Sequence, residues 1–225
     1  MCNREATSRE HVPPLCFFPG SKDSLSGIDF RKNLITVPSC KLHNSEKSGD
    51  DFYLLHLISV AYQNDREGLH RFTERIRETA KSRPYLLKTF FGQSEKAFVN
   101  GLPTLSFELD MKRFESGMTC ISKAIYFFHF KAKWNDALEI LAPSARYSPN
   151  LPNSNRGNVH LAQGEVLDDG SQKFGENQDI FFFQFIEGVL PAHRLLRMVF
   201  YQGFVVWAIP IKRIEYLQRN KLANA

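Results

Sequence analysis

Three prolines limit how the first forty residues of this chain can fold. Pro13 and Pro14 end an extended segment over residues 1–12, because proline has no amide hydrogen to donate to a neighbouring strand. Pro38 in the same way ends the β-type run NLITV, which begins at Asn33. Between them lies FFPGSKDSLSGIDFRK, which is rich in Gly, Ser and Asp. The sequence therefore predicts a short strand, a long loop and a second short strand.

The residues after Pro38 show the spacing of helices. From Ser45, the stretch SEKSGDDFYLLHLISVAYQ repeats apolar residues every three or four positions, which predicts a helix directly after the second strand. Further helices are predicted over residues 65–83 and 111–132 by the same spacing. In the helix over 65–83 the apolar positions are Leu69, Phe72, Ile76 and Ala80.

The last third of the chain is rich in β-type residues. DIFFFQFIEG and RMVFYQGFVVWAIP predict strands, and YQG predicts the turn between two of them. TLSFEL, over residues 104–109, predicts a further strand, and the Pro-, Asn- and Ser-rich stretch over residues 142–158 predicts a linker or long surface loop.

The order of these elements predicts an α+β fold. The chain has 225 residues, which is enough to bury a substantial core in one large domain or two small ones. We expect residues 1–62 to form one domain. Residues 63–225 are then expected to form an α+β companion domain that recognises a substrate or partner.

The composition is that of a folded protein, and it indicates the cellular compartment that we expect. Hydrophobic residues make up 43% of the chain, and the net charge of +5 permits a polyanionic partner without requiring one. No apolar run reaches the roughly 20 residues that span a membrane, and MCNREATSRE is too polar for a signal peptide. We therefore expect a cytoplasmic protein, in which Cys and His serve as metal ligands or buried thiols more often than as disulfide partners.

Cys40 and His43 have the spacing of a zinc-binding turn. Two intervening residues let one turn present both side chains to a tetrahedral ion, and Cys2, beside the first strand, is a third candidate ligand. Cys16 is a less favoured fourth, because it follows two prolines and precedes two phenylalanines. We expect the natural protein to begin earlier, with a further Cys three positions before Cys2. The alternative is that Cys40 is a buried thiol and His43 a surface residue.

Glu10 and His11 are candidates for hydrolytic chemistry. An imidazole titrates near neutral pH and can take a proton from water, while a carboxylate is a hard oxygen ligand for a divalent cation. Neighbours on a strand point to opposite faces. At a strand end we expect that alternation to relax, so that both side chains approach one phosphate. The alternative is a chance pairing of two common residues.

Two asparagines complete this set. The Asn33 amide is expected to bond backbone across the long loop and so to hold the segment that carries His11. Asn44 opens the predicted helix, where it acts either as the helix cap or as an oxygen ligand for a divalent ion.

In this order, REHVPP, NLITVPSC and CKLHNSEKS resemble the HNH endonuclease family, whose fold is the ββα-metal unit. The resemblance covers roughly residues 1–60. It implies that His11 is the general base, Asn33 the central structural Asn, and Asn44 the counterpart of the last His. Glu10 matches the acidic residue beside the base.

The resemblance also implies a zinc site made by Cys2, Cys40 and His43. Two departures matter: the first Cys of the leading pair is absent, and His43 stands where the family usually has a fourth Cys. Imidazole binds zinc well, so only the first departure leaves the site incomplete. Arg9 and Lys47 are the candidate contacts to nucleic acid, although Lys47 also suits a solvated first helical turn.

The resemblance implies a metal-dependent endonuclease, with DNA as the expected substrate. The resemblance implies Mg²⁺ or Mn²⁺ for catalysis, held by Glu10 and Asn44, and Zn²⁺ for structure. One alternative is a non-catalytic, zinc-braced module that binds nucleic acid or protein, for which His11 would be dispensable. Another is a toxin or effector partnered by an inhibitor.

Overall fold

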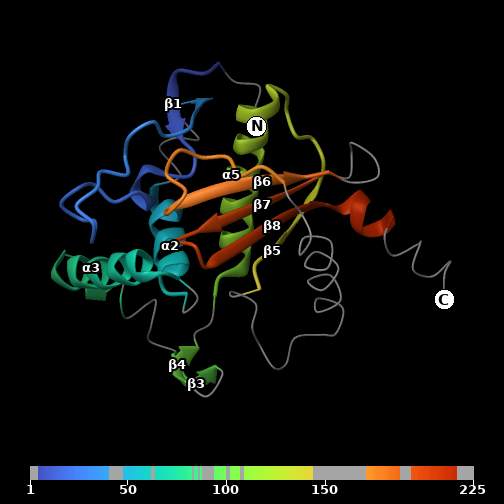
Figure 1. Cartoon of the computed structure of the whole chain (residues 1–225). Helices are drawn as coiled ribbons and strands as arrows, with labels where there is room; N and C mark the ends of the chain where they lie inside the picture. The colour runs from blue at the N-terminus through green and yellow to red at the C-terminus, as the bar shows by residue number, and fades with distance from the viewer. Residues whose placement is uncertain are drawn as a thin grey trace.

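The fold mixes helices with antiparallel sheets (Figure 1), which confirms the predicted α+β class. This computed structural model describes residues 5–40, 48–61, 64–82, 84–85, 87, 94–99, 102–106, 109–143, 171–187 and 194–216. Within those ranges, no helix combines the length and apolar character needed to cross a bilayer.

The amino-terminal elements follow the predicted order of strand, loop, strand and helix. β1 (Ser8–His11) pairs antiparallel with β2 (Thr36–Ser39), and the long β1–β2 loop (residues 12–35) contains the short helix η1 (Leu15–Phe17). α2 (Ser48–Ser59) comes next.

Pro38 lies inside β2, so the prediction that it ends the strand is wrong. The Val12 amide donates to Ile35 O at 2.9 Å, and Arg9 faces Pro38 in the register. Hydrogen-bonded and non-hydrogen-bonded pairs alternate along an antiparallel ladder, which places Pro38 in a non-hydrogen-bonded pair. The amide that proline lacks would point away from β1, so a two-stranded sheet tolerates it there.

The middle of the chain contains two helices and a hairpin. α3 (Arg66–Ser82) agrees with the predicted helix over 65–83. β3 (Glu95–Val99) pairs with β4 (Leu102–Ser106), which overlaps the strand predicted over residues 104–109 in its first three residues. α5 (Met111–Phe130) starts at an N-cap, Asp110, whose side chain accepts a 3.0 Å hydrogen bond from the Arg113 amide.

A four-stranded antiparallel sheet ends the chain. Its order is β5-β8-β7-β6, made by β5 (Leu138–Leu141), β6 (Phe181–Ile186), β7 (Leu195–Phe200) and β8 (Phe204–Pro210). Tyr201 and Gln202 have φ values of 46° and 59° and form the predicted turn between β7 and β8. Residues 211–216 are helical. All but the first two residues of the predicted linker over 142–158 lie outside the described residues.

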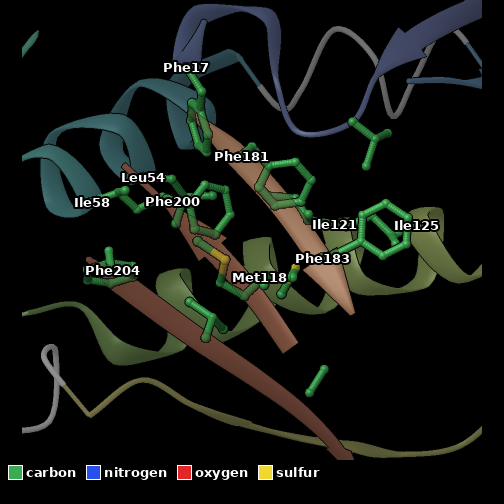
Figure 2. Close-up of a cluster of buried hydrophobic side chains, with 14 of the residues drawn as sticks. Phe17, Leu54, Ile58, Met118, Ile121, Ile125, Phe181, Phe183, Phe200 and Phe204 are labelled. Carbon is green, nitrogen blue, oxygen red and sulfur yellow. The ribbon is translucent and has the colours of Figure 1, made fainter. Parts of the chain in front are cut away.

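One hydrophobic core joins the amino-terminal elements to this sheet. Figure 2 shows phenylalanines of the sheet beside apolar residues of α5, with η1 and α2 closing one end of the cluster. The labelled residues are Phe17, Leu54, Ile58, Met118, Ile121, Ile125, Phe181, Phe183, Phe200 and Phe204. A Cβ on Gly117 would lie 2.7 Å from Leu54 Cδ1, so an alanine there would displace the Leu54 side chain between α5 and α2.

This core crosses the boundary that we predicted after residue 62. Leu54 and Ile58 precede the boundary, whereas Met118 and Phe200 follow it, and all four belong to the same buried cluster. The division into two domains stays a prediction. A second buried cluster, which includes Leu141 and Trp207, lies apart from the first.

Candidate active site

The two faces of the β1–β2 pair carry different chemistry. Residues directly opposite in an antiparallel pair share a face, so His11 lies on the face of Thr36, and Glu10 on that of Val37. Arg9 is exposed on the His11 face, where its Nε and Nη2 donate to Thr36 Oγ1 at 2.9 and 2.7 Å. This exposed face therefore combines a half-buried imidazole with a guanidinium held in one orientation.

Glu10 lies on the inner face of the pair. Val37, directly opposite Glu10, is 5% exposed and belongs to the main core, as does Val12, two residues further along the same face. The ladder continues past the strand through the Val12 amide bond to Ile35 O. The relaxation expected at the strand end is thus absent from these residues, and Glu10 and His11 leave β1 on opposite faces.

Asn33 contributes through its backbone. It is exposed and adopts a φ of 53°, a left-handed conformation that Asn tolerates better than most residues. Among the described residues, the Asn33 side chain makes no hydrogen bond. The hydrogen bond that we predicted from its side-chain amide to backbone across the loop is therefore not seen there. Asn33 instead reverses the chain three residues before β2 begins.

Two distant side chains hold the start of the β1–β2 loop. Tyr201 Oη donates to Phe17 O at 2.7 Å, and Arg71 Nη2 donates to Cys16 O at 2.9 Å. Both side chains are fully buried. Burial raises the pKa of Tyr201 and lowers that of Arg71. The loop that follows His11 is therefore held by α3 and by the β7–β8 turn.

Three further side chains, one of them within the loop, hold the rest of it. Arg31 Nε donates to Phe18 O at 3.0 Å, and the Leu25 amide donates to the Glu67 carboxylate of α3 at 3.2 Å. Asn177, just before β6, donates to Lys32 O at 2.9 Å. Side chains from three parts of the chain thus take the role that we assigned to Asn33.

Sequence reasoning missed Arg71 because it expected the apolar side of α3 to face the protein. Leu69 is 62% exposed and Ala80 is exposed, whereas Gly68, Arg71 and Thr79 are buried. The helix is turned so that a small residue and two polar ones face inward. An arginine at helical spacing from Gly68 was the only local signal, and by itself it does not predict burial.

The predicted zinc ligands are only partly within the described residues. Cys40 is buried at the end of β2, while Cys2, His43, Asn44 and Lys47 lie outside. Where the structure describes the chain, no group of three or more His, Cys, Asp or Glu residues comes together in a way that could hold a metal ion.

The three cysteines that the structure describes, Cys16, Cys40 and Cys120, are free thiols. Burial, followed by the nearby Asp51 carboxylate, raises the pKa of Cys16 to about 11. Without a metal, Cys16 is therefore a neutral thiol at physiological pH. Its Sγ lies 3.8 Å from Asp51 O, its acceptor in α2.

Comparison with known proteins adds no family to these observations. No family model, curated protein or solved structure matches the chain.

Proposed function

We propose that this chain is an HNH-type endonuclease that hydrolyses phosphodiester bonds of nucleic acid, with DNA as the expected substrate. The observation that carries the proposal is the position of His11. It is the last residue of β1 in a unit ordered β1, long loop, β2 and α2, and it shares an exposed face with Arg9.

In this proposal His11 is the general base. Its neutral imidazole takes a proton from water, and the resulting hydroxide attacks phosphorus. The bond between phosphorus and one bridging oxygen breaks, and that oxygen takes a proton from solvent. No net oxidation or reduction occurs.

Arg9 is the proposed contact to the scissile phosphate. A guanidinium has five N–H donors, and Thr36 engages only those on Nε and Nη2. The Nη1 donors are directed away from this bond and remain suited to a phosphate oxygen. The cross-strand bond pre-organises the guanidinium, so that less entropy is lost when phosphate binds.

Metal dependence is part of the proposal, but we derive no step through a metal. Glu10 lies on the face opposite His11, and the other ligand that the resemblance implies, Asn44, is outside the described residues. A divalent cation, when bound, would neutralise charge on the phosphate that is being cleaved. The described residues alone do not form its site.

The test is nicking of supercoiled plasmid in Mg²⁺, in Mn²⁺ and in EDTA. We expect cleavage in at least one metal, none in EDTA, and a loss of about 10²–10⁴-fold in His11→Ala. His70→Ala, in α3, is the matched control and is expected to keep the wild-type rate. Equal rates for His11→Ala and wild type would contradict the assignment. Binding of DNA without cleavage in any metal would favour the non-catalytic module.

A further inference from the structure

α5 ends in the aromatic run Tyr126-Phe127-Phe128-His129-Phe130. Successive residues of a helix are about 100° apart, so five in a row surround the helix completely. Ile121 and Ile125 of α5 are fully buried in the core, whereas the rings of the run pack against the edge of that core. Accordingly, each of the five residues is only partly buried. The last turn of α5 therefore presents aromatic rings to solvent.

Neighbouring rings pack against this turn. The Tyr126 ring stacks on Trp134, with centroids 4.7 Å apart and planes at 22°. The His129 ring contacts Phe174 and Phe185, at centroid distances of 4.5 and 5.1 Å. Phe174 is also half-buried, so the partly exposed rings extend from α5 to the segment before β6. Rings that are already ordered lose little entropy when a ligand stacks on them.

Two cationic side chains lie over the same rings. The guanidinium of Arg194 lies 4.2 Å from the centroid of Phe130, and Lys131 Nζ lies 4.7 Å from that of Phe128. Arg194 also pairs with Glu187 at 2.6 Å. Lys131 is exposed and donates to Phe128 O, which leaves its other ammonium hydrogens available.

The local field on these rings is positive. Burial, followed by the nearby Arg194 and Lys131 cations, lowers the pKa of His129. A ligand that fits this surface carries negative charge together with flat apolar groups.

We propose that this aromatic–basic surface, formed by Tyr126, Phe128, His129, Phe130, Lys131 and Arg194, binds a single strand of nucleic acid. Bases stack on the partly exposed rings, and phosphates contact Lys131 and the outer edge of Arg194. The choice of nucleic acid rests on the proposed function. The surface itself lies outside the HNH-like region and is argued from α5 and its neighbours.

The surface lies near the candidate active site. α5 contacts β2, and Asn177, three residues after Phe174, donates to Lys32 O in the β1–β2 loop. Figure 1 shows β1 and the yellow-green end of α5 at the same end of the molecule. A strand bound on the surface can therefore continue towards His11.

An anionic membrane is the other partner with negative charge and apolar groups. Membrane insertion requires apolar side chains that protrude from the surface. The strongly exposed large apolar side chains of the described residues are Leu15, Leu25, Ile28, Leu69, Tyr85 and Ile211, none of which belongs to this surface. Half-buried rings suit stacking of a base better than insertion into lipid.

The test measures binding separately from cleavage. A fluorescein-labelled 12-nucleotide DNA strand is titrated with His11→Ala protein in EDTA, and anisotropy is recorded at 50 and 200 mM KCl. Lys131→Gln is expected to weaken binding about threefold to tenfold and to lower the salt slope by about one. Phe128→Leu is expected to weaken binding about fivefold or more with the slope unchanged. Lys81→Gln, an exposed lysine of α3, is the charge control and should bind as the parent does.

Thermal unfolding of each variant confirms that it is folded. Unchanged binding in both Lys131→Gln and Phe128→Leu overturns the inference, as does binding to phosphatidylserine vesicles in place of DNA. Binding that depends on Lys131 in a protein that never cleaves supports the surface and contradicts the proposed nuclease. A protein that cleaves DNA, but whose DNA binding is unchanged in Lys131→Gln and Phe128→Leu, supports the proposed nuclease and contradicts the proposed surface.

Discussion

The Tyr201 hydroxyl donates a 2.7 Å hydrogen bond to Phe17 O, which joins the β7–β8 turn to the loop that follows His11. The Tyr201 backbone is engaged as well. Its amide donates to Ile180 O, and its carbonyl accepts from the Asp65 amide. One residue therefore connects the final sheet, the start of α3 and the β1–β2 loop.

Tyr201→Phe is expected to lower the free energy of unfolding by about 1–3 kcal/mol, because Phe17 O loses its donor inside the protein. Urea unfolding measures the change. Tyr85→Phe is the control, since Tyr85 is 66% exposed, and it should shift stability by less than about 0.5 kcal/mol. Equal effects of the two variants would contradict the role given to the Tyr201 hydroxyl.

Substitution by alanine should change stability in opposite directions at two helical glycines. A Cβ on Gly68 would lie 2.8 Å from Tyr201 Cβ and 2.7 Å from Asn64 Cβ, so Gly68→Ala overpacks the joint between α3 and the β7–β8 turn. We expect a loss of about 1–3 kcal/mol. Gly49, in the first turn of α2, is exposed and has room, so Gly49→Ala should gain up to about 1 kcal/mol. Thermal unfolding of both variants checks the contrast.

The Cys16 thiol should make stability depend on alkaline pH. Its pKa is about 11 in the folded protein, against 9.0 for the ordinary thiol. The folded state therefore binds the proton more tightly than the unfolded state. This stabilisation is complete below pH 9, and it is lost between pH 9 and 11 at roughly 1.4 kcal/mol per pH unit at most.

The measurement compares the free energies of unfolding of wild type and Cys16→Ala by urea unfolding at several pH values between 9 and 11. The free energy of unfolding should fall more steeply with pH in wild type than in Cys16→Ala, because the variant lacks the thiol whose pKa is raised by folding. Parallel curves would show that the Cys16 thiol does not carry the dependence.

The sequence predicted the local elements well and the long-range contacts poorly. The Pro13-Pro14 pair, the β-type run NLITV and helical spacing were enough for the order of β1, loop, β2 and α2, because each is set by neighbours along the chain, although Pro38 did not end β2 as expected. The bond between Tyr201 and Phe17 joins residues 184 positions apart, and no local pattern encodes it. Arg71 was missed for a related reason, since its burial depends on Cys16 O and not on the apolar period of α3.

The candidate site was predicted in part. His11 and Arg9 could be assigned to one strand, and strand periodicity gives them one face. That Glu10 faces the core could not be derived, because it depends on the register that pairs Glu10 with Val37. The predicted metal ligands Cys2, His43 and Asn44 lie outside the described residues and stay predictions.

The last prediction concerns the bond between Arg9 and Thr36. Thr36→Val keeps the β-branched shape that suits a strand but removes the oxygen that orients the guanidinium. If Arg9 binds the scissile phosphate, nicking should slow by about tenfold while the salt dependence of DNA binding stays the same, because the charge is retained. Arg9→Gln should slow nicking further and lower the salt slope by about one, because a phosphate contact is lost. Thr73→Val, on the exposed side of α3, serves as the control and should cut at the wild-type rate. A Thr36→Val protein that cuts as fast as wild type would show that the orientation of Arg9 does not matter. An unchanged salt slope in Arg9→Gln would remove Arg9 from the phosphate altogether.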